Sequence, residues 1–227
     1  MALLAGNALV SLNRAKQTVL EKTGQSHKTE YALEVRTHLR EAEATKEETK
    51  VLCDKMKAPL HSFGNAHGVE NKVEAVGVAA HRFAHRLEGC HQAQAHAAVL
   101  EAFGNSQLQI GSHQRDLQEQ VERQVIAHLQ AWILCDYEEL KKERERLHRR
   151  RLDLDASSTS EKNSEQHQAF DEQLAQVEKH LERLPTVHRE HAALIRTHLK
   201  LQRDYYLKGL AAIDEAIQKS DAKVATD

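Results

Sequence analysis

The chain has 227 residues, of which 40% are hydrophobic and 29% charged, and its 32 Lys and Arg against 34 Asp and Glu give a formal net charge of −2. This balance excludes a bulk attraction to nucleic acid, so an anionic partner must bind a local cluster of cations. With 9 Gly, 2 Pro and 4% aromatic residues, the chain lacks the turns and aromatic runs of a β-protein, which leaves a mostly helical fold.

Cysteine spacing and apolar run length exclude two further classes. Cys53, Cys90 and Cys135 are tens of residues apart, so they form neither a disulfide framework nor a paired metal motif, and they favour a reduced cytoplasmic compartment. The longest nearly apolar run, residues 125–134, is far shorter than the roughly 18 to 20 residues of a membrane span. We therefore expect a cytoplasmic protein that does not cross a bilayer.

Residues 1–22 are predicted to form an amphipathic helix, because their apolar side chains share one arc at about 100° per residue. Arg14 and Lys16 follow the apolar part, whereas the charge of a secretory signal precedes it, and a mitochondrial transit peptide stays open as an alternative. A lone helix of this length is marginal in water, so we expect it to be disordered until a membrane takes up its apolar face. An ordered, packed helix in the lipid-free protein would contradict both the insertion and the targeting interpretation.

The next segment is predicted to be a long helix. From Val35 to Phe63 apolar side chains recur at steps of three and four residues, which is the pattern of a coiled-coil seam. Pro59 and two glycines then break the pattern, so we expect a connection at about residues 58–70.

A second long helix is predicted from Val69 to Leu154, with Gly104 and Gly111 as candidate interruptions. Over its last part the apolar residues stand seven apart and most other positions are charged. Such a long helix must lie against equally long neighbours. The small and polar residues 156–166 are expected to form the turn that follows it.

A third helix is predicted from Gln168 to Lys219, with a bend at Pro185, because proline removes one backbone hydrogen bond and presses on the preceding turn. The predicted fold is all-α, with three long, kinked, antiparallel helices in a coiled-coil bundle. Seams of this length leave more apolar surface than one subunit covers, so we expect a homodimer.

Three segments resemble the N-BAR domains of amphiphysin and endophilin, and the BAR parts of Rho-GTPase-activating proteins are similarly close. Residues 12–30 read LNRAKQTVLEKTGQSHKTE, an amphipathic helix that runs into a glycine and then a Lys-Thr pair. Residues 136–157 contain a basic run followed by the Arg-Leu-Asp-Leu-Asp signature of Arg151 to Asp155. The closing segment LQRDYYLKGLAAIDEAI matches the family's last helix, with Tyr205 at its usual tyrosine.

This resemblance implies a crescent-shaped BAR homodimer that binds anionic phospholipid membranes on its concave face and inserts its N-terminal helix as a wedge. It implies a peripheral membrane protein in endocytosis or vesicle trafficking, and it divides the chain into an insertion helix (1–22), a BAR domain (23–220) and a tail (221–227). The alternative is a dimeric BAR scaffold that holds a small GTPase or another protein with little membrane remodelling, which the net charge of −2 slightly favours.

The residues expected to contact lipid fall into two groups. On a helical wheel, most cations of residues 141–151 lie opposite the apolar seam, while Arg144 and Arg151 flank the seam and are expected to pair across it. A solvated charged face with local pairs, such as Glu145 with Arg149, is the simpler explanation. For anionic-lipid binding we predict Arg14, Lys16, Lys141, Lys142, Arg146, Arg149 and Arg150, and for membrane insertion Leu4, Leu9, Leu12, Val19 and Leu20.

The 16 histidines do not make a metal site. His81 with His85, and His188 with His191, lie about one helical turn apart and could each supply two ligands. Zinc needs three or four protein ligands, however, and no local motif supplies the others. Lowering the pH to about 5.5 is expected to strengthen vesicle binding through exposed histidines, or to weaken the dimer if seam histidines such as His198 are buried. No Gly-rich phosphate loop or nucleophile elbow is present, so we predict no catalytic residues, no metal, no cofactor and no enzyme activity.

Overall fold

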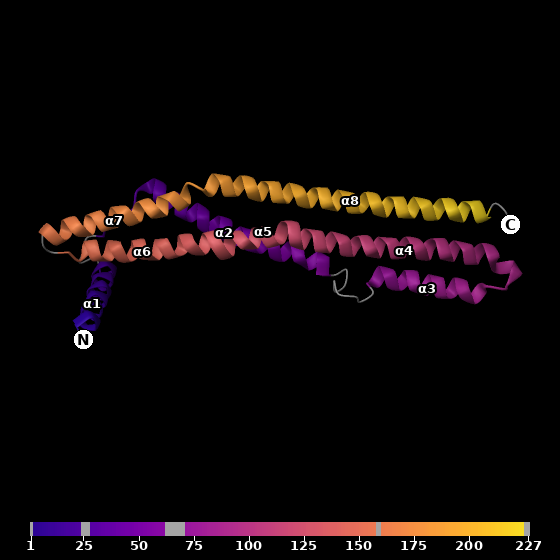
Figure 1. Ribbon diagram of the computed structural model, residues 1–227, viewed down its shortest axis with the longest axis horizontal. Helices are drawn as coiled ribbons and strands as arrows, with labels where there is room; N and C mark the ends of the chain where they lie inside the picture. The colour runs from indigo at the N-terminus through magenta and orange to yellow at the C-terminus, as the bar shows by residue number, and fades with distance from the viewer. Residues whose placement is uncertain (1, 24–27, 62–70, 158–159, 225–227) are drawn as a thin grey trace. The chain divides into compact units, whose positions relative to one another are not determined.

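The computed structural model describes residues 2–23, 28–61, 71–157 and 160–224. Within these ranges all regular secondary structure is helical, which confirms the predicted all-α class (Figure 1). The helices are α1 (Ala2–Lys22), α2 (Leu33–His61), α3 (Lys72–Leu87), η1 (His91–Ala93), α4 (Gln94–Val121), η2 (Glu122–Ile126), α5 (Ala127–Trp132), η3 (Ile133–Tyr137), α6 (Glu138–Asp155), α7 (Ser160–Leu181) and α8 (Leu184–Val224).

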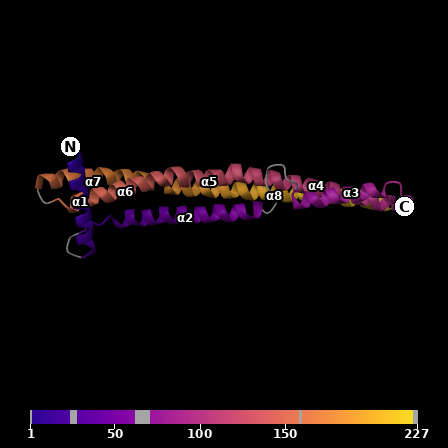
Figure 2. The ribbon, with the colours of Figure 1, turned by 90° about the horizontal axis from the view of Figure 1, so that it is seen from below.

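The chain divides into two compact units, each with its own apolar core. The first unit comprises residues 1–49 and 131–189, and the second comprises residues 50–130 and 190–227. In the first unit α6 and α7 run side by side as an antiparallel pair (Figures 1 and 2). Their predicted seams meet in one buried cluster that includes Leu140, Leu147, Leu154, Phe170, Val177 and Leu181.

The second unit contains an antiparallel hairpin of α3 and α4, in which glycines let the two helices approach closely. A Cβ at Gly77 would meet the carbonyl oxygen of Gly104, and a Cβ at Gly104 would collide with the ring of His81. Gly104 and Gly111, the candidate interruptions, lie inside the unbroken helix α4. The predicted interruption at Gly104 and Gly111 is therefore wrong, because these glycines serve helix packing rather than a break.

The second predicted helix breaks elsewhere, between Leu87 and Ala93. Gly89 has φ of +90°, a conformation that residues with a Cβ rarely adopt, and it turns the chain from α3 towards α4. From Gln94 to Asp155 the helix is then continuous except for two π-helical turns, η2 and η3. The hydrophobic periodicity did not indicate these π turns.

The other predicted boundaries differ from the structure by a few residues. Helix α2 continues through Pro59 to His61, while residues 62–70 of the predicted connection lie outside the described residues. Helix α7 already begins at Ser160, so the predicted turn at residues 156–166 is too long. The bend at Pro185 is confirmed: two turn residues separate α7 from α8, and Pro185 is the second residue of α8, where its missing N–H costs no helical hydrogen bond.

No helix in the described ranges combines the length and apolarity that crossing a bilayer requires.

We predict that Leu147→Ala lowers the free energy of unfolding by about 2–5 kcal/mol, because Leu147 is fully buried in the first unit and its truncation leaves a cavity. Urea unfolding of the full chain, followed by circular dichroism, measures this change. Leu134→Ala is the matched control, since Leu134 is 71% exposed and should change the free energy by less than about 0.5 kcal/mol. Equal effects of the two substitutions would contradict the assigned core.

Candidate functional site

Helix α1 packs against α6 through its polar face. The Arg14 guanidinium donates two hydrogen bonds to the carboxylate of Asp153, from Nε to Oδ1 at 2.7 Å and from Nη2 to Oδ2 at 2.6 Å. Gln17, one turn further along the same face, is 5% exposed. The structure therefore contradicts the expectation that residues 1–22 are disordered until they insert, and with it the insertion interpretation in that form and the targeting interpretation. Because apolar side chains of α1 stay exposed, lipid contact by a helix that is already formed is left as a proposal.

A second ion pair holds the end of α1. Arg151 donates from Nη1 and Nη2 to the carboxylate of Glu21 at 3.0 and 2.9 Å, and from Nη1 to Asp155 Oδ2 at 2.9 Å. Asp155 also accepts hydrogen bonds from the backbone N–H and the hydroxyl of Thr29. These contacts tie α1, the start of the following segment and α6 together. We call the set of Arg14, Glu21, Thr29, Arg151, Asp153 and Asp155 the anchor network.

The contact between Arg151 and Glu21 favours the charged form of both side chains. Burial by itself lowers the pKa of Arg151, but the hydrogen bond and the charge of Glu21 outweigh it and raise the pKa above its usual value. Burial likewise pushes the pKa of Glu21 up, yet the bond to Arg151 brings it below its usual value. The Arg151 side chain is 3% exposed, so loss of a partner would leave a buried charge unpaired, a change that typically costs about 3–5 kcal/mol.

The apolar face of α1 points away from α6. Leu12 is 67% exposed and Val19 is 59% exposed, with Ala15 between them on the same face. Lys16 and Lys22 flank this row and are exposed too. We call these five residues the α1 outer face. It carries no carboxylate, because Glu21, the only acidic residue of α1, is turned towards Arg151.

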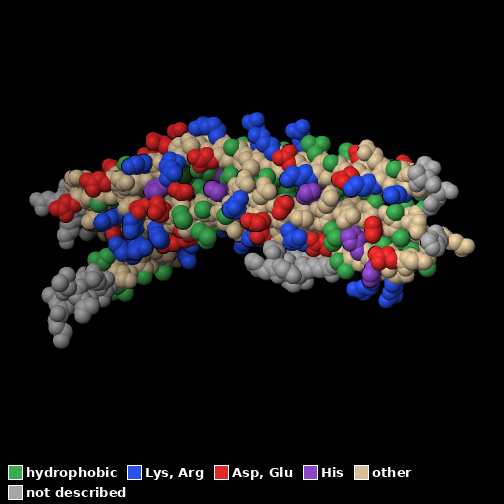
Figure 3. Space-filling model, turned by 45° about the vertical axis from the view of Figure 1, so that its right-hand side comes forward, with side chains coloured by type: hydrophobic (Ala, Val, Ile, Leu, Met, Phe, Trp, Pro, Cys, Tyr) green, Lys and Arg blue, Asp and Glu red, His purple; other side chains and the backbone are tan. Residues whose placement is uncertain are grey.

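The predicted cations of α6 form a second exposed surface, the α6 basic face, made of Lys142, Arg146, Arg149 and Arg150. Figure 3 shows Lys and Arg side chains gathered near the place where α1 meets the rest of the first unit. Two of the four have local partners: Arg146 pairs with Glu143, and Arg149 lies 3.9 Å from Glu145. Lys142 and Arg150 have no ion pair among the described residues.

The other residues predicted to contact lipid are ion-paired, half-buried or have side chains outside the described residues. Arg14 is engaged with Asp153, so binding lipid would require this pair to open. Lys141 lies 3.4 Å from Glu138, and Leu20 is half-buried. The side chains of Leu4 and Leu9 lie outside the described residues. The lipid roles of all these residues stay predictions.

Arg144, which flanks the apolar seam of α6, pairs across that seam as the sequence predicts. Arg144 donates to Glu43 of α2 at 3.0 Å, and the same carboxylate accepts the hydroxyl of Tyr137 at 2.6 Å. Burial, followed by this hydrogen bond, raises the pKa of Tyr137 to about 12. These contacts join α2 to α6 within the first unit.

The sequence pattern did not identify the anchor network. The polar residues 14, 17 and 21 recur at steps of three and four, and this spacing would have indicated a buried polar face on α1.

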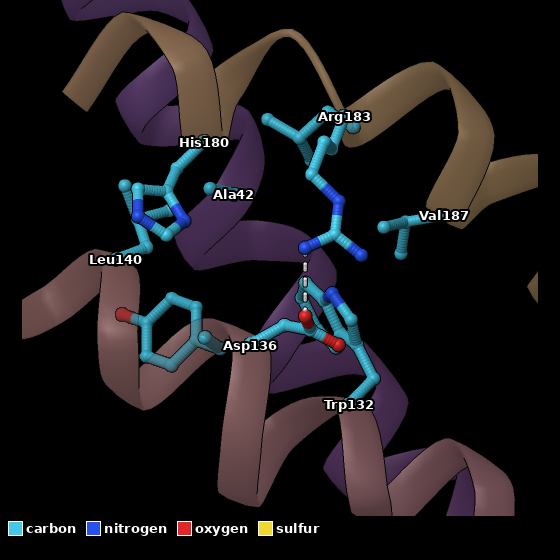
Figure 4. Close-up of a pocket in the computed structure, with 9 residues that line it drawn as sticks. Ala42, Trp132, Asp136, Leu140, His180, Arg183 and Val187 are labelled. Atoms are coloured by element: carbon cyan, nitrogen blue, oxygen red, sulfur yellow. Dashed lines mark hydrogen bonds and ion pairs between the residues drawn. The ribbon is translucent and has the colours of Figure 1, made fainter. Parts of the chain in front are cut away.

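A small cavity lies in the first unit beside the break between α7 and α8. It has a volume of about 20 Å³, room for about one water molecule, and Arg183 closes part of it by donating to Asp136 at 3.0 Å (Figure 4). Trp132, Leu140 and Val187 supply apolar walls. Tyr137 and His180 also line the cavity, which lies at the junction of the helices. In the described part of the chain no three His, Cys, Asp or Glu side chains are grouped to hold a metal ion.

In the second unit, α8 carries a row of exposed apolar side chains, which we call the α8 stripe. Its members repeat at seven-residue steps in two interleaved series, as on one side of a coiled coil. They are Leu199, Tyr206 and Ile213 in one series and Leu210, Ile217 and Val224 in the other, and all are 42–61% exposed. No helix of the described chain covers this stripe.

Comparison with known proteins identifies one family. A family model described as BAR domain matches residues 8–221. Endophilin-B1 of Gallus gallus is 28% identical over 231 residues, which cover 91% of this chain and 63% of that protein. Endophilin-B1 of Homo sapiens is 28% identical over 228 residues, covering 89% of this chain and 62% of the relative. The chain thus spans less than two thirds of the length of these relatives.

We predict that His198 makes the protein less stable in mild acid. Burial lowers the pKa of His198, and its Nδ1 has no hydrogen-bond partner among the described residues. Below the ordinary pKa of about 6.5 the unfolded chain binds a proton that the folded chain resists, so stability falls as the pH falls towards the folded-state pKa. Melting temperatures at about pH 7.5 and 5.5 measure this loss.

His198→Gln should reduce the loss of melting temperature between these two pH values. His128→Gln, which changes an exposed histidine, is the control and should leave the loss unchanged. An equal pH dependence in wild type and His198→Gln would contradict the role assigned to burial of this ring.

Proposed function

Because the chain belongs to the BAR domain family, we propose that it binds anionic phospholipid membranes and senses or generates their curvature as a homodimer. The family model covers residues 8–221, nearly the whole chain. BAR domains generally dimerise and bind membranes, and they act as structural rather than enzymatic modules. We propose a peripheral membrane location and a role in endocytosis or vesicle trafficking.

The observation that carries this proposal is the α1 outer face. An amphipathic helix that packs on a protein normally buries its leucine and valine side chains, but α1 exposes them. They lie beside Lys16 and Lys22, and no carboxylate lies on this face. A surface with this composition suits the boundary between lipid head groups and acyl chains, where apolar side chains are buried and lysines meet anionic head groups. Leu12 and Val19 are therefore the insertion residues that the geometry supports best.

The α6 basic face supplies the electrostatic part of the proposal. Each cation close to an anionic leaflet contributes about 1 kcal/mol, and a dimer presents two copies of the four residues. The partners of Arg146 and Arg149 are local glutamates on the same helix, at surface positions where an ion pair is worth little. Anionic lipid can therefore replace these partners at small cost.

The α8 stripe supports the homodimer. Its seven-residue repeat requires a second helix with a matching repeat, and a second copy of this chain provides one. Each large apolar side chain that becomes fully buried contributes about 1.5–3 kcal/mol, so six per subunit give a substantial driving force for association. The proposed interface therefore uses α8 of both subunits.

We predict that the triple variant Lys142→Glu, Arg149→Glu and Arg150→Glu loses binding to vesicles that contain phosphatidylserine, because it replaces attraction by repulsion. Cosedimentation with and without anionic lipid measures the effect. A matched control reverses three exposed cations of α7 and α8, Lys179, Arg189 and Lys200, and should keep most of the binding. Unchanged binding of the α6 triple variant would exclude the α6 basic face, and absence of binding by the wild type would favour a protein scaffold for a small GTPase.

We predict that light scattering gives about twice 25.7 kDa at micromolar concentration. The double substitution Leu210→Glu and Ile213→Glu should give a monomer, because it places four charges in the proposed interface. Leu134→Glu changes an even more exposed apolar residue of the first unit and should leave the dimer intact. A monomeric wild type would contradict the proposed interface.

A further inference from the structure

We propose that Thr186 is a phosphorylation site for a protein kinase that recognises an arginine three residues ahead of the acceptor hydroxyl, and that the phosphate draws Arg183 away from Asp136. Residues 183–186 read Arg-Leu-Pro-Thr. This modification acts on the junction of α7 and α8 in the first unit. It goes beyond the proposed membrane binding and does not depend on it.

Thr186 lies in the first turn of α8, on the side that faces solvent. Leu184 and Val187 are each 5% exposed and line the small cavity at the junction, whereas Pro185 and Thr186 are exposed. The two turn residues 182–183 interrupt the helix just ahead of this position. Local opening at such an interruption costs less than opening within a continuous helix, so an enzyme can reach the acceptor.

The hydroxyl of Thr186 differs from those of other threonines on the long helices. The hydroxyls of Thr37, Thr45 and Thr197 each donate to the carbonyl oxygen one turn back, at 2.8, 2.8 and 3.1 Å. Thr186 Oγ1 instead accepts from Arg189 Nη2 at 2.8 Å, and its own proton has no acceptor among the described residues. A hydroxyl that is not engaged as a donor is free to give its proton to a base, as a phosphoryl acceptor must.

Two guanidinium groups flank this hydroxyl. Arg183 stands three residues ahead of Thr186 and is 60% exposed, so the acidic side chains of a kinase that selects basic substrates can bind it. Arg189 already contacts the hydroxyl oxygen and would form charge-assisted hydrogen bonds to a phosphate there. Glu182 and Glu190 lie four residues to either side, but both are exposed, so solvent and salt screen their repulsion.

The modification is a phosphoryl transfer from ATP. Thr186 Oγ1 attacks the γ-phosphorus, the bond from that phosphorus to the bridging oxygen breaks, ADP leaves with the electron pair, and the hydroxyl proton passes to the catalytic base of the kinase. The product carries a charge of about −1.5 to −2 near neutral pH and three acceptor oxygens. The dipole of α8 stabilises a negative charge in its first turn.

The phosphate competes with Asp136 for Arg183. In the unmodified chain Arg183 Nη1 donates to Asp136 Oδ1 at 3.0 Å (Figure 4). An ion pair this exposed contributes little, whereas an arginine contact with a phosphate is charge-assisted and frequently bidentate. Loss of the pair opens the cavity beside Trp132, the single tryptophan of the chain. The Trp132 side chain, which is 9% exposed, should then become more accessible to solvent.

The test is phosphorylation of the full chain by the catalytic subunit of cAMP-dependent protein kinase with ATP, read by mass spectrometry. Trypsin should release residues 184–189 as one peptide, and this peptide should carry one phosphate. Thr186→Ala should abolish that phosphate, and Arg183→Gln should slow its addition at least about tenfold by removing the recognised arginine. Arg196→Gln is the control and should leave the rate unchanged, because it precedes Thr197, whose hydroxyl is bonded to the backbone.

Asp136→Asn separates recognition of Arg183 from loosening of the junction. This variant releases Arg183 without removing it, so phosphorylation of Thr186 should be faster. Arg183→Gln loses the same ion pair but should be slower. Faster phosphorylation of both variants would overturn the role given to Arg183, and a wild-type peptide without phosphate would overturn the site itself.

Acrylamide quenching of Trp132 fluorescence tests the transfer of Arg183 from Asp136 to the phosphate. The phosphorylated chain should be quenched more strongly than the unmodified chain, and unphosphorylated Asp136→Asn should change in the same direction. Thr186→Ala incubated with the kinase and ATP is the control and should stay unchanged. Equal quenching of the phosphorylated and unmodified wild type would overturn the transfer of Arg183.

Discussion

The arrangement of α1 on α6 depends on one interaction, the pairing of Arg151 with Glu21 and Asp155. A guanidinium that is almost fully buried must find carboxylates, since an unpaired charge in that position would destabilise the fold strongly. Its partners come from α1 and from α6 itself, and Asp155 also accepts hydrogen bonds from Thr29. One buried cation thus determines where the end of α1 lies against α6, and its partner Asp155 also holds Thr29 there.

This constraint explains why an amphipathic helix exposes its apolar side. In most proteins the apolar side chains decide how a helix packs, because their burial is the largest favourable contribution. In α1 the polar side makes the ion pairs with α6, and loss of Glu21 would leave the buried Arg151 with Asp155 alone, so the polar side stays packed and the apolar side remains free. The same residues that stabilise the contact between α1 and α6 leave an exposed surface whose apolar and cationic composition suits an anionic membrane.

The two units use their surfaces for different purposes in this proposal. The first unit carries the α1 outer face and the α6 basic face, and the second carries the α8 stripe with its coiled-coil repeat. Leu12 and Val19 are seven residues apart, like neighbouring members of each α8 series, so spacing alone does not separate the two surfaces. The α1 outer face is short and is flanked by lysines, whereas the α8 stripe continues from Leu199 to Val224, as expected of a helix that pairs with another helix. Their separation along the chain allows membrane binding and dimerisation to be tested independently.

Local periodicity determined much of this protein. The 3.6-residue repeat indicated the helical class, the buried seam through Leu147 and Val177 and the amphipathic helix at residues 1–22. The missing backbone N–H of Pro185 and its steric pressure on the preceding turn indicated the bend before α8. These features depend on residues within a few turns of one another. The tertiary structure decided that Gly104 packs against α3 rather than ending a helix, and that Arg14 and Glu21 find partners 139 and 130 residues away. No local pattern encodes such pairs, because the folding of the whole chain brings their charges within hydrogen-bonding distance, and that distance decided which face of α1 is free.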